Sequence, residues 1–162
     1  TNLIIVQIIQ FKNSRVSLNE IKIDKLNMSS KVLSVSNNNN TRIIWSGPRN
    51  WLIVSSNKEI LNEIHEKFDA NNFAVTDLSH SKAIIEIEGN QAKEVLKKGC
   101  PFNFNELIKD NSLNSVYHGM SITVDMLNDQ PDKFRIFALR SFGESLYHSI
   151  TDASLEFGYL GK

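Results

Sequence analysis

The segment covering residues 120–139 constrains the fold of this chain more than any other, because it has the pattern of two paired strands. Its first half alternates apolar with polar side chains, which is the period of a strand that buries one face. The apolar members of this alternation are Met120, Ile122, Val124 and Met126. Residues 128–132 then supply a hairpin loop to a second strand over 133–139. The segment predicts an antiparallel pair in a sheet.

Five more segments have the composition of strands. They cover residues 3–9, 42–46, 51–54, 73–78 and 82–88. The second and third of them flank the turn 47–50, Gly-Pro-Arg-Asn. The four asparagines at 37–40 have no apolar face to bury and readily form local side-chain turns, so they predict a surface loop.

Two helices are predicted by apolar stripes that follow a capping box, the Ser-x-x-Glu spacing of a helix start. One box lies at 56–59 and leads into a helix that ends near Phe68. The other lies at 141–144 and opens the last helix of the chain. The stripe of this last helix is Phe142, Leu146, Ile150, Ala153 and Phe157.

A third, short helix over residues 91–98 completes the pattern, with Asn90 as its cap and Gly99 as a left-handed terminator. The order of elements predicts an α+β fold in two layers, with largely antiparallel sheets, helices on one face and ferredoxin-like units. A chain of 162 residues suits one compact domain, residues 1–162. It also suits two tightly packed halves, 1–50 with N-terminal strands and 51–162 with the α+β unit.

Composition argues against several classes of partner. The 18 basic and 18 acidic residues balance, which gives no general electrostatic reason to bind nucleic acid or an anionic membrane. The apolar run at 3–9 is far shorter than the roughly 20 residues of a membrane span. The single cysteine, Cys100, excludes an internal disulfide and fits a reducing cytoplasm. We therefore expect a cytoplasmic protein.

Asp77, Ser79 and His80 place an acid, a hydroxyl and an imidazole within four positions. A nucleophilic triad needs these groups to converge, but neighbouring residues of an extended strand project to opposite faces. A hydrolase that uses Ser79 or Cys100 is therefore the least favoured hypothesis. Asp and Ser at a corner between strands usually bond the local backbone, so we interpret this corner as structural.

Cys100 could pair with His80 or His118 as a thiol–imidazole couple, but it follows a helix C-terminus, where the helix dipole disfavours a thiolate. A buried structural cysteine is the favoured interpretation. The four histidines lack metal-ligand spacing, and the glycines form no phosphate-binding loop. The sequence therefore predicts no catalytic, cofactor-binding or metal-binding residues.

The segment 45–51, Trp-Ser-Gly-Pro-Arg-Asn-Trp, has two interpretations. It is a hairpin that anchors the core with Arg49 in water, or an aromatic and arginine surface that meets a partner, because Trp and Arg are enriched in interface hot spots. The second interpretation predicts an exposed apolar patch that includes Trp45 or Trp51.

Five segments in order resemble one family, the gamma subunit of heterotetrameric sarcosine oxidase. They cover residues 45–52, 76–83, 89–104, 140–146 and 156–158. The resemblance implies a fold similar to the folate-binding aminomethyltransferase fold and a subunit without chemistry of its own. It also makes five residues candidates for contact with a partner subunit: Trp45, Arg49, Trp51, His80 and Arg140.

The resemblance further implies a complex that oxidatively demethylates sarcosine to glycine, forms hydrogen peroxide and passes the one-carbon unit to tetrahydrofolate. FAD, FMN, NAD and tetrahydrofolate are then expected in the alpha and beta partner subunits, and zinc in a small delta subunit. This chain would pack against the folate-binding alpha subunit. The alternative is a stand-alone folate-binding protein of the aminomethyltransferase type. Such proteins are longer and have further domains that enclose the pterin, which we expect a chain of this length to lack.

Overall fold

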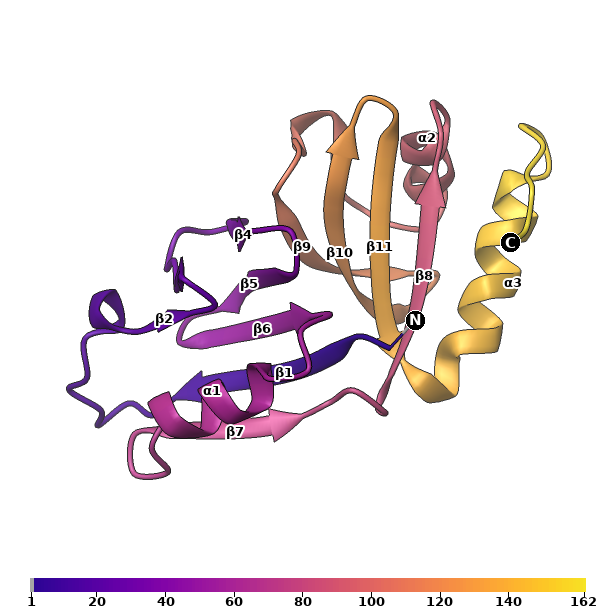
Figure 1. Ribbon diagram of the computed structural model, residues 1–162. Coiled ribbons are helices and arrows are strands. Elements are labelled where there is room, and N and C mark those ends of the chain that lie inside the picture. The colour runs from indigo at the N-terminus through magenta and orange to yellow at the C-terminus, as the bar shows by residue number, and fades with distance from the viewer. Residues whose placement is uncertain (1) are drawn as a thin grey trace. The chain divides into compact units, whose positions relative to one another are not determined.

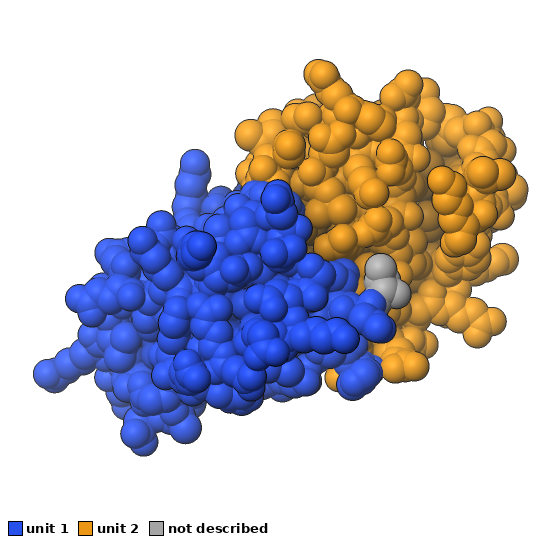
Figure 2. All heavy atoms as spheres, viewed as in Figure 1, with its two compact units in different colours: residues 1–80 blue, residues 81–162 orange. Residues whose placement is uncertain are grey.

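The computed structural model describes residues 2–162 and contains two compact units, residues 1–80 and 81–162 (Figures 1 and 2). The division that we expected near residue 50 lies between His80 and Ser81 instead. The reason is strand pairing: the strand that begins at Asn50 pairs on both sides with strands from the first 50 residues. The second half therefore cannot begin at residue 51.

The first unit contains a five-stranded antiparallel sheet in the order β4-β5-β6-β1-β7 (Figure 1). Its strands are β1 (Ile4–Gln10), β4 (Val35–Asn37), β5 (Thr41–Gly47), β6 (Asn50–Ser55) and β7 (Phe73–Asp77). A two-stranded hairpin, β2 (Lys22–Ile23) with β3 (Leu26–Asn27), follows a short 3₁₀ helix at Leu18–Glu20. The asparagine loop is confirmed for residues 38–40, where the Asn38 side-chain oxygen accepts from the backbone amides of Asn40 and Thr41. Asn37 is instead the last residue of β4.

Helix α1 (Ile60–Lys67) packs on one face of this sheet and closes the core of the first unit. The buried side chains include Val6, Ile8, Ile43, Trp51, Ile53, Ile60, Ile64, Phe68 and Phe73. The predicted capping box is wrong: Asn57, not Ser56, accepts a hydrogen bond from the Glu59 amide, at 3.0 Å. The predicted apolar stripe is confirmed, because Ile60, Ile64 and Phe68 are buried. Burial of this face stabilises the helix even though the predicted cap does not form.

The second unit contains a four-stranded antiparallel sheet in the order β8-β11-β10-β9. Its strands are β8 (Lys82–Glu88), β9 (Ser112–Tyr117), β10 (Met120–Asp129) and β11 (Asp132–Leu139). Helices α2 (Ala92–Lys97) and α3 (Gly143–Ser154) contact this sheet, and 3₁₀ turns lie at Phe104–Glu106 and Arg140–Phe142 (Figure 1). The hairpin predicted over 120–139 is confirmed by the pairing of β10 with β11. So is the predicted α+β fold class.

The two sheets are joined by a pair of strands that are close in sequence but do not pair with each other. Strands β7 and β8 follow each other closely, but β7 pairs with β1 and β8 pairs with β11. The chain passes from one sheet to the other between them, at the boundary of the two units.

Three local predictions for the second unit also need correction. Neither Asn90 nor Ser141 makes a side-chain cap: the residues that precede α2 and α3 are Gln91 and Phe142, and neither cap position has a side-chain hydrogen bond. Gly99 does not have the predicted left-handed conformation. A side chain there would instead lie 2.8 Å from the buried ring of Tyr117, so close packing requires the glycine.

Candidate functional site

At the corner of Asp77, Ser79 and His80, the first two residues form a local hydrogen-bond network with the backbone. The Asp77 carboxylate accepts from the Ser79 amide at 2.9 Å and from the Ser79 hydroxyl at 2.6 Å. The same hydroxyl accepts from the backbone amide of Ile5, at 3.0 Å, which fixes the end of β7 against β1. These bonds from Ser79 lower the pKa of Asp77 below its usual value. These hydrogen bonds to the backbone support the interpretation of Asp77 and Ser79 as a structural corner.

Ser79→Ala is expected to lower the free energy of unfolding by about 1–2 kcal/mol, because it leaves the amide of the fully buried Ile5 without this partner. The variant also removes the hydroxyl that stabilises the Asp77 carboxylate. A lowered carboxyl pKa contributes stability above the unfolded pKa of about 4, and this contribution is lost as the pH falls through the folded pKa. Urea unfolding from neutral to acidic pH checks both effects. A wild-type advantage that grows on acidification would contradict this account.

Cys100 is buried, and its thiol donates a hydrogen bond to the Ser115 hydroxyl at 3.1 Å. Burial raises the pKa of this thiol above its ordinary value. A raised pKa leaves less thiolate at neutral pH, which is the reverse of what a nucleophile needs. The predicted structural role of Cys100 fits this environment.

Cys100 is expected to react with iodoacetamide at least roughly a hundredfold more slowly in the native chain than in urea, at about pH 8. Both lost access and the raised pKa act in this direction. Mass spectrometry of timed samples measures the two rates. Equal rates in the folded and unfolded chain would show that the thiol is accessible and activated.

The two tryptophans of the hairpin, Trp45 and Trp51, differ in burial. Trp51 is 1% exposed in the core, and its indole nitrogen donates to the Ser29 carbonyl at 2.8 Å. It has no surface to offer a partner, so its candidacy as an interface residue is withdrawn. Trp45, opposite Trp51 across β5 and β6, is half-buried against the same core. The exposed Arg49 has a φ of 59° and donates from its guanidinium to the Phe11 carbonyl at 2.7 Å.

His80 and Arg140, the other two candidates, are both exposed. The backbone amide of Arg140 donates to the Ser81 carbonyl at 2.9 Å, which joins the end of β11 to the start of β8. Residues 2–162 contain no group of three His, Cys, Asp or Glu side chains that could hold a metal ion. No helix within the same residues is long and apolar enough to cross a membrane.

A surface that the sequence did not reveal lies at the C-terminal end of the chain. Most of the exposed large apolar side chains fall between residues 139 and 160. We call five of them the C-terminal apolar surface: Tyr147 on α3, and Leu155, Phe157, Tyr159 and Leu160 after it. Leu155 and Leu160 are 64% and 84% exposed. Clustered exposure of this kind is typical of an interaction surface.

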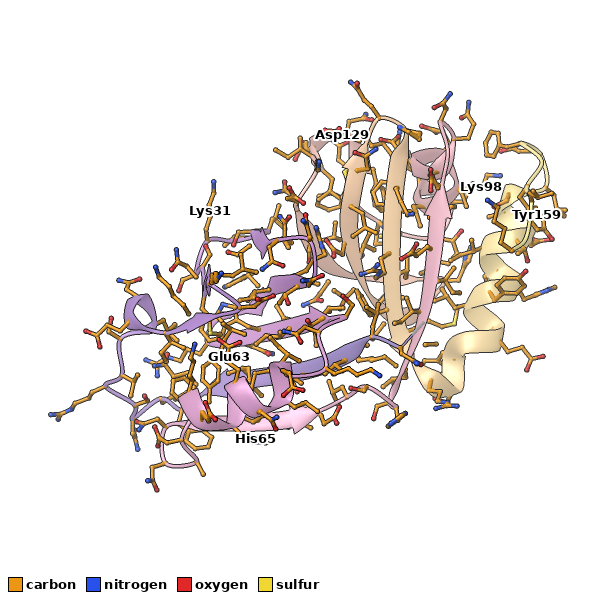
Figure 3. The ribbon with its side chains drawn as sticks, viewed as in Figure 1. Lys31, Glu63, His65, Lys98, Asp129 and Tyr159 are labelled. Carbon is orange, nitrogen blue, oxygen red and sulfur yellow. The ribbon has the colours of Figure 1, made fainter. Side chains whose placement is uncertain are left out.

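Contacts with α2 hold the C-terminal segment in place. The ammonium of Lys98 lies 2.6 Å from a carboxylate oxygen of Glu156, donates to the Ala153 carbonyl and lies 4.8 Å from the centre of the Phe157 ring. Gly158, with a φ of 73°, turns the chain back along α3, so that Gly161 lies next to the Tyr147 hydroxyl (Figure 1). Tyr159 lies on this returning segment (Figure 3).

Comparison with known proteins supports the predicted resemblance. The chain is 28% identical over 125 residues to the sarcosine oxidase subunit gamma of Corynebacterium sp. strain U-96, and 26% identical over 118 residues to that of strain P-1. Each match covers 72% of this chain and 58% of the relative, so the chain spans less than two thirds of these proteins. No protein-family model matches the chain.

A solved structure gives the same answer for the fold. A chain of the heterotetrameric sarcosine oxidase from Corynebacterium sp. U-96, in complex with pyrrole 2-carboxylate, superposes with a TM-score of 0.86. The match covers 99% of this chain and 84% of the other, at 20% identity. The resemblance found in the sequence is therefore confirmed by relatives named as gamma subunits and by a shared fold.

Proposed function

We propose that this chain is the gamma subunit of a heterotetrameric sarcosine oxidase. The observation that carries the proposal is the sequence similarity to two gamma subunits, together with a fold shared along nearly the whole chain. The stand-alone folate-binding alternative is not favoured, because both relatives carry the name of a subunit.

The proposed role is structural support of a complex whose chemistry takes place in other subunits. Asp77 and Ser79 are hydrogen-bonded to each other, Ser79 is also hydrogen-bonded to the backbone of β1, and the Cys100 thiol is buried. The proposal accordingly assigns FAD, FMN, NAD and tetrahydrofolate to the alpha and beta subunits, and a cytoplasmic location to the assembly. Sarcosine is the proposed substrate of the complex as a whole.

Contact with a partner subunit is assigned first to the C-terminal apolar surface. Its five side chains are the largest concentration of exposed apolar groups in residues 2–162. Arg49, His80, Arg140 and the half-buried Trp45 remain candidates for the polar rim of such an interface, where charged groups set specificity more than affinity.

Co-expression with the alpha, beta and delta subunits encoded by the same genome tests the proposal. An affinity tag on this chain is expected to retain all three partners through size-exclusion chromatography, and the retained complex to oxidise sarcosine. Assembly of a fully active complex that never retains this chain would reject the proposed function. Calorimetric titration of the isolated chain with tetrahydrofolate is expected to be silent, and micromolar binding would favour the folate-binding alternative.

A further inference from the structure

A hollow of about 390 Å³ lies on the sheet of the second unit. Strand register places six of its eight lining residues on one face: Lys82, Asn114, Val116, Ser121, Thr123 and Phe137. The opposite face carries Ala83 beside Gly143 of α3, and Tyr117 bonded to Val95 of α2. The hollow therefore lies on the face that does not carry the helices.

Lys82 is the only ionisable side chain among the eight that line the hollow. It is half-buried, and burial lowers the pKa of its ammonium group. Within residues 2–162 it has no carboxylate partner. Lys133, on the same face, differs: its ammonium lies 3.4 Å from Glu86 and 3.2 Å from Glu88. Partial burial without a counter-charge makes a bound anion more favourable beside Lys82 than beside a fully hydrated lysine.

The remaining lining combines apolar and hydroxyl groups. The half-buried Val116 supplies apolar surface, Ser121 and Thr123 supply hydroxyls, and Phe137, at 1% exposed, lies beneath the surface of the sheet. The Thr123 hydroxyl donates to the Asn114 side chain at 2.7 Å, which holds two of these residues in place. One positive charge beside a small apolar area and hydroxyl groups is complementary to a small molecule that has one carboxylate and a small apolar body.

We propose that this hollow is a binding site for a small organic carboxylate, with Lys82 as the residue that recognises the carboxylate group. The volume falls in the usual range of small-molecule sites, roughly 300–1,000 Å³. The proposal concerns this chain alone and does not depend on its membership of a sarcosine oxidase.

Benzoate is a suitable probe, and its neutral isostere benzamide is the matched control ligand. Titration of the ¹⁵N-labelled chain, followed by NMR, is expected to give saturable shifts at the Val116, Ser121 and Thr123 amides, with a Kd on the order of a few millimolar. Benzamide is expected to bind at least tenfold more weakly. Shifts that do not saturate, or equal binding of the two ligands, would overturn the proposal.

Variants identify the residue responsible. Lys82→Met is expected to abolish the saturable shifts and Lys82→Arg to retain them, while Lys133→Met, on the same sheet face, leaves them unchanged. Binding to Lys82→Met with the wild-type Kd would overturn the assignment. If that variant does not fold, the wild-type chain still decides: benzoate is expected to raise the pKa of Lys82, followed at its side-chain methylene, and an unchanged pKa would reject the contact.

Discussion

Trp51→Ala is expected to lower the free energy of unfolding by about 3–5 kcal/mol, the largest effect of any single truncation proposed for this chain. Trp51 is among the largest fully buried side chains and lies in the core that α1 closes. Its removal leaves a cavity that the β-sheet cannot close, and it also removes the bond to the Ser29 carbonyl. Urea unfolding followed by far-ultraviolet circular dichroism measures the change.

Two further variants separate the causes. Trp51→Phe keeps most of the apolar volume but loses the indole donor, and is expected to cost about 1–3 kcal/mol. Trp45→Ala removes a half-buried side chain from the same hairpin and is expected to cost less than Trp51→Ala. A larger loss at Trp45 than at Trp51 would contradict the assignment of the core anchor.

The two tryptophans show what the sequence could predict here and what it could not. The turn at residues 47–50 and the strands on either side were predictable, because turn residues and apolar runs are local signals. The unequal burial of the pair was not. It follows from strand order: β6 lies in the middle of the sheet, while β5 has only the short β4 beyond it. Strand order depends on distant residues, which periodicity does not report.

The same limit explains the misplaced boundary between the units. Periodicity identified β7 and β8 as strands, but it carries no information on which partner each strand takes. The chain changes sheets after His80, and no proline or glycine marks residues 77–82 as a linker. The polar corner of Asp77 and Ser79 is the local sign of that change, since it terminates β7 through bonds to its own backbone and to β1.

The last helix shows why the C-terminal apolar surface was missed. The sequence predicts one helical apolar stripe from Phe142 to Phe157. Its middle members, Leu146, Ile150 and Ala153, are buried as predicted. Its ends are 39% exposed, because α3 runs only from Gly143 to Ser154 and helical spacing has no meaning beyond those residues. Helix ends are the least predictable part of a helix, and here they decide which apolar groups remain on the surface.

The double variant Tyr159→Ser/Leu160→Ser is expected to weaken association with the partner subunits by roughly tenfold to a hundredfold, the second large effect that we predict. Both side chains are more than half exposed in this chain, at 53% and 84%, so their loss leaves the core intact. Large apolar groups at the centre of an interface account for most of its affinity. Because most interface substitutions act on the dissociation rate, truncating two of these groups is expected to raise that rate and to change the association rate little. Biolayer interferometry against the alpha–beta–delta complex measures both rates.

Val32→Ser is the matched control for this pair, because Val32 is also exposed, at 61%, but belongs to the first unit. It is expected to leave the affinity unchanged, and neither variant should shift the unfolding midpoint. Equal loss of affinity in both variants would mean that any exposed apolar side chain contributes. An unchanged affinity in the double variant would move the contact from the C-terminal apolar surface to Arg49, His80 and Arg140. The charges of the two arginines would then make association strongly dependent on salt.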